Sequence, residues 1–303
     1  QGDAHRVLRA FPGLWWRDLR ALPDGRVPVG RTLGFGDAHV ENFGWLAFDR
    51  GVRFAFNDLD DSGEVEIALD VLRYFTSVTL SGDGVDVAAL AKTWADGLRS
   101  PGELTRKGPA APPPPEEMRK AAIDDWKKDA RSDLYAATSA ERDAVVAALA
   151  DKKVTRHYDV RDVKRRVVID GGSGGNVRYW ALVREGGDDD VLELKQMTTA
   201  GAEQGRGAVA TDKRLKTVRE ALWTGDTLSP YHEVDLAARG DKPAPYLARS
   251  RGKRRSWKVE KFGPPRYATQ VEMLAAVHAR ALSSATPPPD ALADWVLSST
   301  QAV

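Results

Sequence analysis

The 303-residue sequence contains no cysteine, which excludes disulfides, thiol nucleophiles and thiolate metal sites together. It also has no excess of charge: 45 Lys and Arg stand against 44 Asp and Glu, so nothing in the net charge of +1 favours nucleic acid or a membrane as a partner. No apolar run approaches the roughly 20 residues of a transmembrane helix. We therefore expect a cytoplasmic protein. Because the chain starts at Gln1 rather than Met, a removed N-terminal targeting segment stays open.

The residues that are present have the balance of a globular protein, with 42% hydrophobic and 29% charged residues. Helical and strand-like patterns are both found, which predicts an α+β fold. Helices are expected at 5–20 (interrupted at Pro12), 66–80, 85–98, 116–134, 139–151, 211–222, 267–282 and 290–298. Strands are expected at 52–56, 167–169, 177–183, 191–194, 231–237 and 245–249, with 251–261 as a basic loop.

The stretch 33–61, LGFGDAHVENFGWLAFDRGVRFAFNDLDD, places polar residues among apolar ones. Asp37, His39 and Asn42 lie in one turn, and Asp58 and Asp60 follow the strand 52–56. A buried carboxylate costs several kcal/mol without a partner. A divalent cation such as Mg²⁺, shared with phosphate, would pair with these hard oxygens. The alternative is that GD and ND mark turns, in which Asp and Asn cap local backbone groups.

A second polar feature is a glycine-rich turn within 160–197, followed by a strand that ends at Lys195. The turn consists of Gly171, Gly172, Ser173, Gly174 and Gly175. Such a turn lets backbone N–H groups approach phosphate. It is also a common flexible hairpin, and it matches neither the Walker A nor the Rossmann pattern. A lysine at a strand end is usually solvated, so Lys195 and the turn indicate a phosphate site only together with the stretch 33–61.

The order GDAHVEN, strand, acidic cluster resembles the catalytic segment of aminoglycoside phosphotransferases and their protein-kinase-like relatives, HGDxHxxN followed by a strand and a metal-binding Asp. The full string GDxHxxNFG with NDxD is most similar to a bacterial family known only as a domain of unknown function and grouped with the kinase-like fold. The chain departs from the pattern twice. Phe35 stands where the relatives have the first His, and NDLDD replaces DFG or IDF.

The resemblance implies roles for the residues of the catalytic loop. Asp37 would orient the acceptor hydroxyl and accept its proton, with His39 beside it, and Asn42 would bind Mg²⁺. Asp58 would be the second metal ligand, with Asp60 as the competing choice. Asp58 is favoured because the family pattern has a further Asp twelve residues on, where this chain has Asp70.

The resemblance also implies a nucleotide site. Lys195 would pair with the α- and β-phosphates of ATP, covered by the glycine turn 171–175. The helix 211–222 would donate Glu220 to this lysine, with Glu203 as the alternative.

In kinase-like folds the glycine loop and lysine precede the catalytic loop, whereas here the catalytic loop comes first. The resemblance therefore implies a two-lobed kinase-like fold in circular permutation. Residues 1–155 would form the catalytic-loop segment and helical large lobe, 156–262 the β-rich nucleotide-binding lobe, and 263–303 helices that return to the large lobe. Lys195 should then face Asp58 across a cleft, and the helix 267–282 should pack beside the loop 36–42.

The leading hypothesis is an ATP- and Mg²⁺-dependent phosphotransferase acting on an unidentified hydroxyl acceptor. The second is a nucleotide-binding pseudokinase with an interaction role. The third is a metallophosphoesterase, suggested by GDAH. That chemistry needs two metals and several histidines, yet the chain has only five, of which His39 alone has a suitable context.

Overall fold

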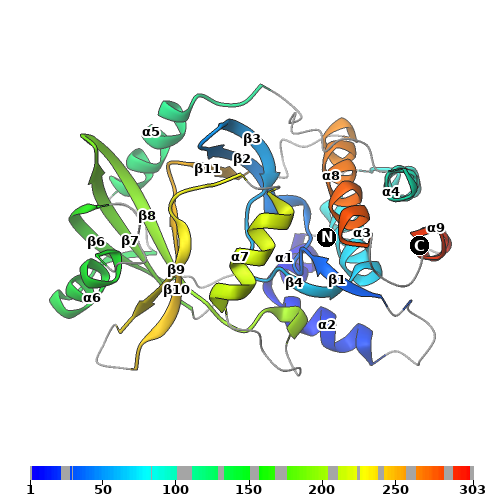
Figure 1. Ribbon diagram of the computed structural model, residues 1–303, viewed down its shortest axis with the longest axis horizontal. Helices are drawn as coiled ribbons and strands as arrows, with labels where there is room; N and C mark the ends of the chain where they lie inside the picture. The colour runs from blue at the N-terminus through cyan, green and yellow to red at the C-terminus, as the bar shows by residue number, and fades with distance from the viewer. Residues whose placement is uncertain are drawn as a thin grey trace.

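The computed structural model describes residues 2–21, 28, 30–82, 84–100, 111–128, 133–150, 157–167, 176–203, 211–223, 226–237, 242–256, 264–282 and 289–300. A large sheet lies at one end of the molecule, most helices lie at the other end, and two small sheets and α7 lie between them (Figure 1). The combination of helices with antiparallel sheets confirms the α+β class. None of the described helices is long and apolar enough to cross a membrane.

The large sheet has six antiparallel strands in the order β5-β6-β7-β8-β10-β9. The strands are β5 (Leu134–Ala136), β6 (Asp159–Val167), β7 (Val177–Glu185), β8 (Asp188–Gln196), β9 (Tyr231–Leu236) and β10 (Ala244–Ser250). α6 (Ser139–Leu149) covers one face, where Val145 and Leu149 pack in one cluster with Leu192 and Leu194 of β8. Every second residue of these strand segments is apolar, and these residues form the buried face beneath α6.

The other face of the sheet carries several charged residues and turns toward the rest of the molecule (Figure 1). Directly opposed residues of antiparallel strands share a face. Lys195 of β8 lies opposite Arg178 of β7, and Glu193 lies opposite Trp180 on one side and Arg249 of β10 on the other. These five residues therefore project from one face. α5 (Pro115–Trp126) covers the end of this face beyond Trp180.

The predicted catalytic stretch forms two small sheets. β1 (Arg31–Gly34) pairs with β4 (Gly63–Glu66), and the hairpin β2 (Phe43–Phe48) and β3 (Gly51–Phe56) is extended by β11 (Arg254–Ser256). A short helix, η1 (Val40–Asn42), precedes β2. At the open end of the hairpin, Phe56 packs edge to face against both Phe35 and Phe43, and all three rings are buried, which fixes this end to the core.

The helical end surrounds α3 (Ile67–Ser81), most of whose residues are buried. α1 (Gly2–Ala10) and α2 (Pro12–Arg20) meet at the expected break before Pro12. α4 (Val87–Arg99) packs against α8 (Pro264–Leu282) and α9 (Pro289–Thr300). α7 (Thr211–Leu222) packs against β9 and β1 and joins the two ends of the molecule.

Several details differ from the sequence prediction. The strand expected at 167–169 overlaps β6 only at Val167, and residues 168 and 169 lie outside the described residues. β1, β2 and β4 were not among the expected strands. The helix expected over 116–134 ends at Trp126, because Leu134–Ala136 pairs with β6 instead. Part of the expected basic loop is the strand β11, paired with β2. α5 and α6, which were expected within the large lobe 1–155, pack on the six-stranded sheet.

Candidate active site

The turn before Asp37 is fixed by one buried carboxylate. Asp70 accepts the backbone N–H groups of Phe35 (2.8 Å) and Gly36 (3.0 Å), and its Oδ2 lies 3.2 Å from Nε2 of His278 on α8. Gly36 has φ of +72°, and a Cβ there would lie 1.8 Å from the carbonyl oxygen of Asp61. The chain therefore needs glycine at this point, and Asp70 holds the backbone that aims Asp37.

The expected position of the helix 267–282 is confirmed. Gln270 of α8 donates to the carbonyl oxygen of Val40 at 3.1 Å, and Tyr74 of α3 hydrogen-bonds the same glutamine at 2.8 Å. α8 therefore packs beside the loop 36–42.

Asp37 is held by two basic side chains. Nε of Arg73 donates to Oδ1 of Asp37 at 2.9 Å, Nη2 of Arg73 also contacts this oxygen, and Nε2 of His39 lies 3.5 Å from Oδ2. Burial alone would raise the pKa of Asp37, but the charge of Arg73 and then the interaction with His39 outweigh it and hold this pKa well below its usual range. Asp37 is therefore a carboxylate at neutral pH.

Asn42 and His39 orient this carboxylate. Nδ2 of Asn42 donates to the carbonyl oxygen of Asp37 (2.9 Å) and faces its Oδ2 (3.4 Å). Nδ1 of His39 accepts the N–H of Glu41 at 3.2 Å, so the ring hydrogen is assigned to Nε2, toward Asp37. The N–H of Asn57 donates to the carbonyl oxygen of Asn42 at 2.8 Å. This bond closes the hairpin, so the acidic cluster begins directly beside the loop.

Lys195 lies at the acidic cluster, as expected from the permuted order. It is buried, it forms an ion pair with Asp60, and its Nζ lies 3.6 Å from Oδ2 of Asp58. Nη1 of Arg249 donates to Oδ1 of Asp58 at 2.7 Å. The approach of Lys195 to Asp58 is confirmed, although the two residues lie in distant parts of the sequence. Their roles toward a nucleotide stay a prediction.

The pKa values of Asp58 and Asp60 are shifted in opposite directions by their neighbours. Burial would raise the pKa of Asp58, but Arg249 and then Lys195 lower it well below its usual range. Burial and the adjacent charge of Asp58 raise the pKa of Asp60. The two carboxyl groups are hydrogen-bonded to each other, and one of them holds a proton more tightly.

The donors of this cluster fit a hard divalent cation in part. Among the described residues, no group of three or more His, Asp or Glu side chains is arranged to hold a metal ion. Mg²⁺ is commonly bound by only one or two carboxylates together with substrate phosphate and water. Asp58 and Asp60 supply two such carboxylates, and the amide N–H of Asn42 is occupied by Asp37, which leaves its oxygen as a donor.

One of the predicted nucleotide contacts, Glu220, is not part of this cluster. The glycine turn 171–175 lies outside the described residues. Glu220 is exposed on α7, whose inner side packs through Leu215 and Val218. The carboxylates that neutralise Lys195 therefore come from the acidic cluster and not from Glu220. The alternative, Glu203, is buried in the short helix η2 (Gly201–Glu203).

Sequence reasoning missed three charged residues that build the site: Arg73, Glu193 and Arg249. Glu193 is fully buried and accepts Nε and Nη2 of Arg249 at 2.9 and 2.7 Å. It also accepts Nη1 of Arg178 at 3.2 Å. A signal was present: Glu193 alternates with Lys195 on one strand, and Arg73 sits within an otherwise apolar helix.

Comparison with known proteins found a match for one part of the chain. Residues 2–96 match the family described as an uncharacterized protein conserved in bacteria (DUF2252). No curated protein and no solved structure matched the chain. The matched segment contains Asp37, Asn42 and Asp58, whereas Lys195 and Arg249 lie beyond it. The family match thus covers the loop and the acidic cluster, but not the sheet that completes the site.

Proposed function

We propose that the chain is an ATP- and Mg²⁺-dependent phosphotransferase that moves a phosphoryl group to a hydroxyl acceptor, on a circularly permuted kinase-like fold. The observation that supports this best is the buried contact of Lys195 with Asp58 and Asp60. A buried lysine beside two carboxylates is an arrangement suited to receiving phosphate together with a divalent cation.

The metal and the nucleotide would be held by residues of two segments. Asn42, Asp58 and Asp60 would bind Mg²⁺, and Lys195 would position the phosphates. When bound, the ion neutralises charge on the phosphates, and ATP supplies the phosphoryl group. Arg249 keeps Asp58 ionised and fixes its Oδ1.

Asp37 would act on the acceptor. Its side chain is 13% exposed, so a hydroxyl group can reach it. Arg73 keeps it ionised, while His39 and Asn42 fix its orientation. A carboxylate with so low a pKa is a weak base, so Asp37 contributes mainly by accepting the hydrogen bond of the hydroxyl and orienting it.

The pseudokinase hypothesis is favoured by one observation, the ion pair of Arg73 with Asp37, which reduces the basicity of the only expected base. Nucleotide would then bind without turnover. The metallophosphoesterase hypothesis gains no such support from the described residues, which hold no cluster of metal-binding side chains for two ions.

Calorimetric titration with Mg²⁺-ATP tests the binding step. We expect Asp58→Asn and Asp60→Asn to weaken binding at least tenfold, because each removes a negative oxygen ligand. The control is Asp189→Asn, on the same sheet but with its side chain accessible to solvent. Unchanged affinity in both cluster variants would show that the site is wrong.

Turnover is then followed as phosphate transfer from ATP across a panel of hydroxyl-bearing metabolites. Asp37→Asn keeps the size of the side chain and removes its charge, so turnover should fall by about 10²–10⁴-fold with nucleotide affinity retained. Nucleotide binding without transfer to any member of the panel would favour the pseudokinase.

A further inference from the structure

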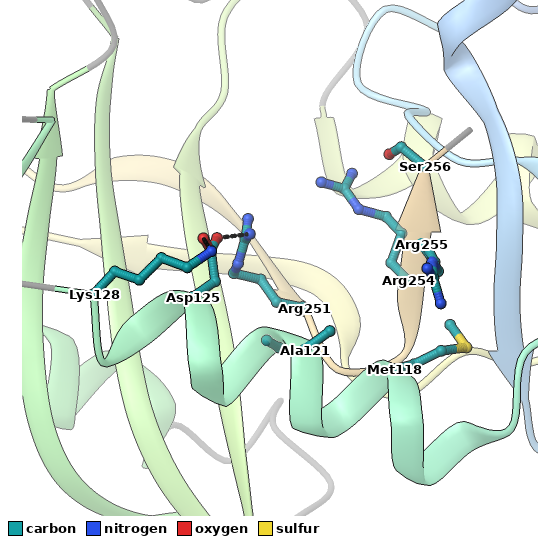
Figure 2. Close-up of a pocket in the computed structure, with 9 residues that line it drawn as sticks. Met118, Ala121, Asp125, Lys128, Arg251, Arg254, Arg255 and Ser256 are labelled. Carbon is teal, nitrogen blue, oxygen red and sulfur yellow. Dashed lines mark hydrogen bonds and ion pairs between the residues drawn. The ribbon is translucent and has the colours of Figure 1, made fainter. Parts of the chain in front are cut away.

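A cavity of about 350 Å³ lies between α5 and β11, near the covered end of the polar sheet face (Figure 2). Its charged lining residues are Asp125 of α5, Lys128 two residues after the end of α5, Arg251 directly after β10, and Arg254 and Arg255 of β11. Four cations therefore face one carboxylate, an excess of three positive charges in a chain whose net charge is +1.

The single carboxylate is already shared. Arg251 donates to Oδ2 of Asp125 at 2.9 Å, and Nζ of Lys128 lies 3.5 Å from Oδ1 (Figure 2). Arg255 forms no ion pair with any residue that the structure describes. Arg254 lies 3.8 Å from Glu193, whose carboxylate is bound more closely by other arginines. Within the part of the chain that the structure describes, Arg255 thus has no carboxylate partner, and Arg254 has only the carboxylate of Glu193, which it shares with other arginines.

Two of these arginines are held in place before any ligand arrives: Arg251 by its stacking described next, and Arg254 by donating from Nη1 to the carbonyl oxygen of Asn57 at 3.4 Å. The guanidinium of Arg251 stacks 3.8 Å above the ring of Trp180, and its buried Nε has no hydrogen-bond partner among the described residues. Burial and the nearby charge of Arg249 lower the pKa of Arg254, so its cationic form is short of compensation. Positioned guanidinium groups of this kind bind phosphate oxygens in pairs.

The cavity is separate from the Lys195 site. Val191, Glu193 and Lys195 follow one another on the same face of β8, and the N–H of Arg251 donates to the carbonyl oxygen of Val191 at 2.8 Å. Glu193 stands between the two places, is fully buried, and is packed with Arg249. This ion pair lies between Val191 and Lys195 along the sheet, and none of Lys195, Asp58 and Asp60 lines the cavity.

We propose that this cavity is a second anion site, which binds a small phosphate-bearing polyanion separately from the nucleotide. The inference goes beyond the proposed phosphotransferase activity and does not rest on it. The ligand carries at least two negative charges, because the lining offers an excess of three. The phosphate could belong to a separate metabolite or to a nucleotide, and the two sources are distinguished by competition.

Calorimetric titration with inorganic pyrophosphate tests the site. We expect saturable binding that weakens with added salt, and at least a tenfold loss of affinity in the double variant Lys128→Ala/Arg255→Ala. Both side chains are exposed, so the fold should persist. The matched control is Lys120→Ala on the same helix, whose lysine pairs with Asp124 outside the cavity. Absence of saturable binding, or equal affinity in the double variant and the control, would overturn the proposal.

The titration is repeated with Mg²⁺-ATP at saturation. Pyrophosphate binding that persists supports a second site, whereas its loss shows that the cavity belongs to the nucleotide site and overturns the proposal. Asp58→Asn separates the two claims, because it should weaken Mg²⁺-ATP and leave pyrophosphate affinity unchanged. Should nucleotide binding fail in every form of the protein, the pyrophosphate titration still decides on the cavity.

Discussion

Replacing Glu193 with Gln should destabilise the protein strongly while preserving the shape of the side chain. The carboxylate is fully buried, and its two oxygens accept three hydrogen bonds from the guanidinium groups of Arg178 and Arg249 and one from Nε1 of Trp180 (3.3 Å). Three further arginines lie 3.6–3.9 Å away. The neutral amide would leave these cations buried around a group that carries no charge and donates hydrogen bonds of its own.

The magnitude follows from the loss of one partner of a buried ion pair, which typically costs about 3–5 kcal/mol. That is a large part of the roughly 5–15 kcal/mol that stabilises a folded domain. The pKa gives a second expectation. Burial would raise the pKa of Glu193, but Arg249 and Arg178 hold it well below its usual value of 4.5. Its stabilising contribution is therefore complete above pH 4.5 and is lost as the pH falls through the folded-state pKa.

Urea unfolding, followed by circular dichroism at several pH values, measures both effects. Glu193→Gln should lower the free energy of unfolding at pH 7 and flatten its decline below pH 4.5. Asp189→Asn, on the same strand, removes the carboxylate of a solvent-accessible pair with Arg184 and should change little. The reasoning is refuted if Glu193→Gln lowers the free energy of unfolding by less than about 1 kcal/mol and the decline below pH 4.5 is as steep as in the wild type.

Three further predictions concern the catalytic loop and its surroundings. Gly36→Ala should lower the free energy of unfolding, measured by thermal denaturation, by about 2 kcal/mol or more, because φ is positive and the new Cβ would clash with backbone. Gly51→Ala, where φ is +114° but the space is open, should lower it by only about 1 kcal/mol. Asp70→Asn should cost about 1–3 kcal/mol and speed amide hydrogen exchange at Phe35, since one of its oxygen acceptors becomes a donor. Burial first, and then neighbouring cationic groups, lower the pKa of His5 to about 4 from 6.5. The unfolded chain therefore binds this proton more readily, stability falls as the pH drops from 6.5 toward 4, and His5→Leu should flatten that part of a melting-temperature profile.

The sequence predicted those elements whose pattern is local and long. α3 and α7 have sustained helical periodicity, and β7 and β8 have apolar runs between turn residues, so each was found near its true bounds. Among the strands that were missed, β5 and β11 have only three residues each, too few for a period. They are strands because β6 and β2 pair with them, which is a property of the fold and not of the segment.

The candidate site likewise consists of residues that a local pattern reveals and residues that only the fold brings to it. Asp37, Asn42 and Asp58 lie within a short motif, so their identity could be read locally. Their partners Arg73 and Arg249 could not be read from that motif, since a buried carboxylate needs a cation but does not specify which distant residue supplies it. Arg73 could have been noticed, because a cation in an apolar helix three residues after Asp70 implies buried partners for both. Arg249 lies within an ordinary strand and gives no such signal.

Arg249 also explains why the motif alone does not make the site. Its Nη1 binds Asp58, while its Nε and Nη2 bind Glu193, so one guanidinium is shared by the acidic cluster and the sheet. The charge on Asp58 is therefore set by a strand that lies outside the matched segment 2–96. Lys195 enters from the same face of the same sheet, next to Glu193 along β8. A fragment ending after α4 would keep the carboxylates and lose both cations, leaving Asp58 and Asp60 as an uncompensated acidic pair rather than a phosphate site.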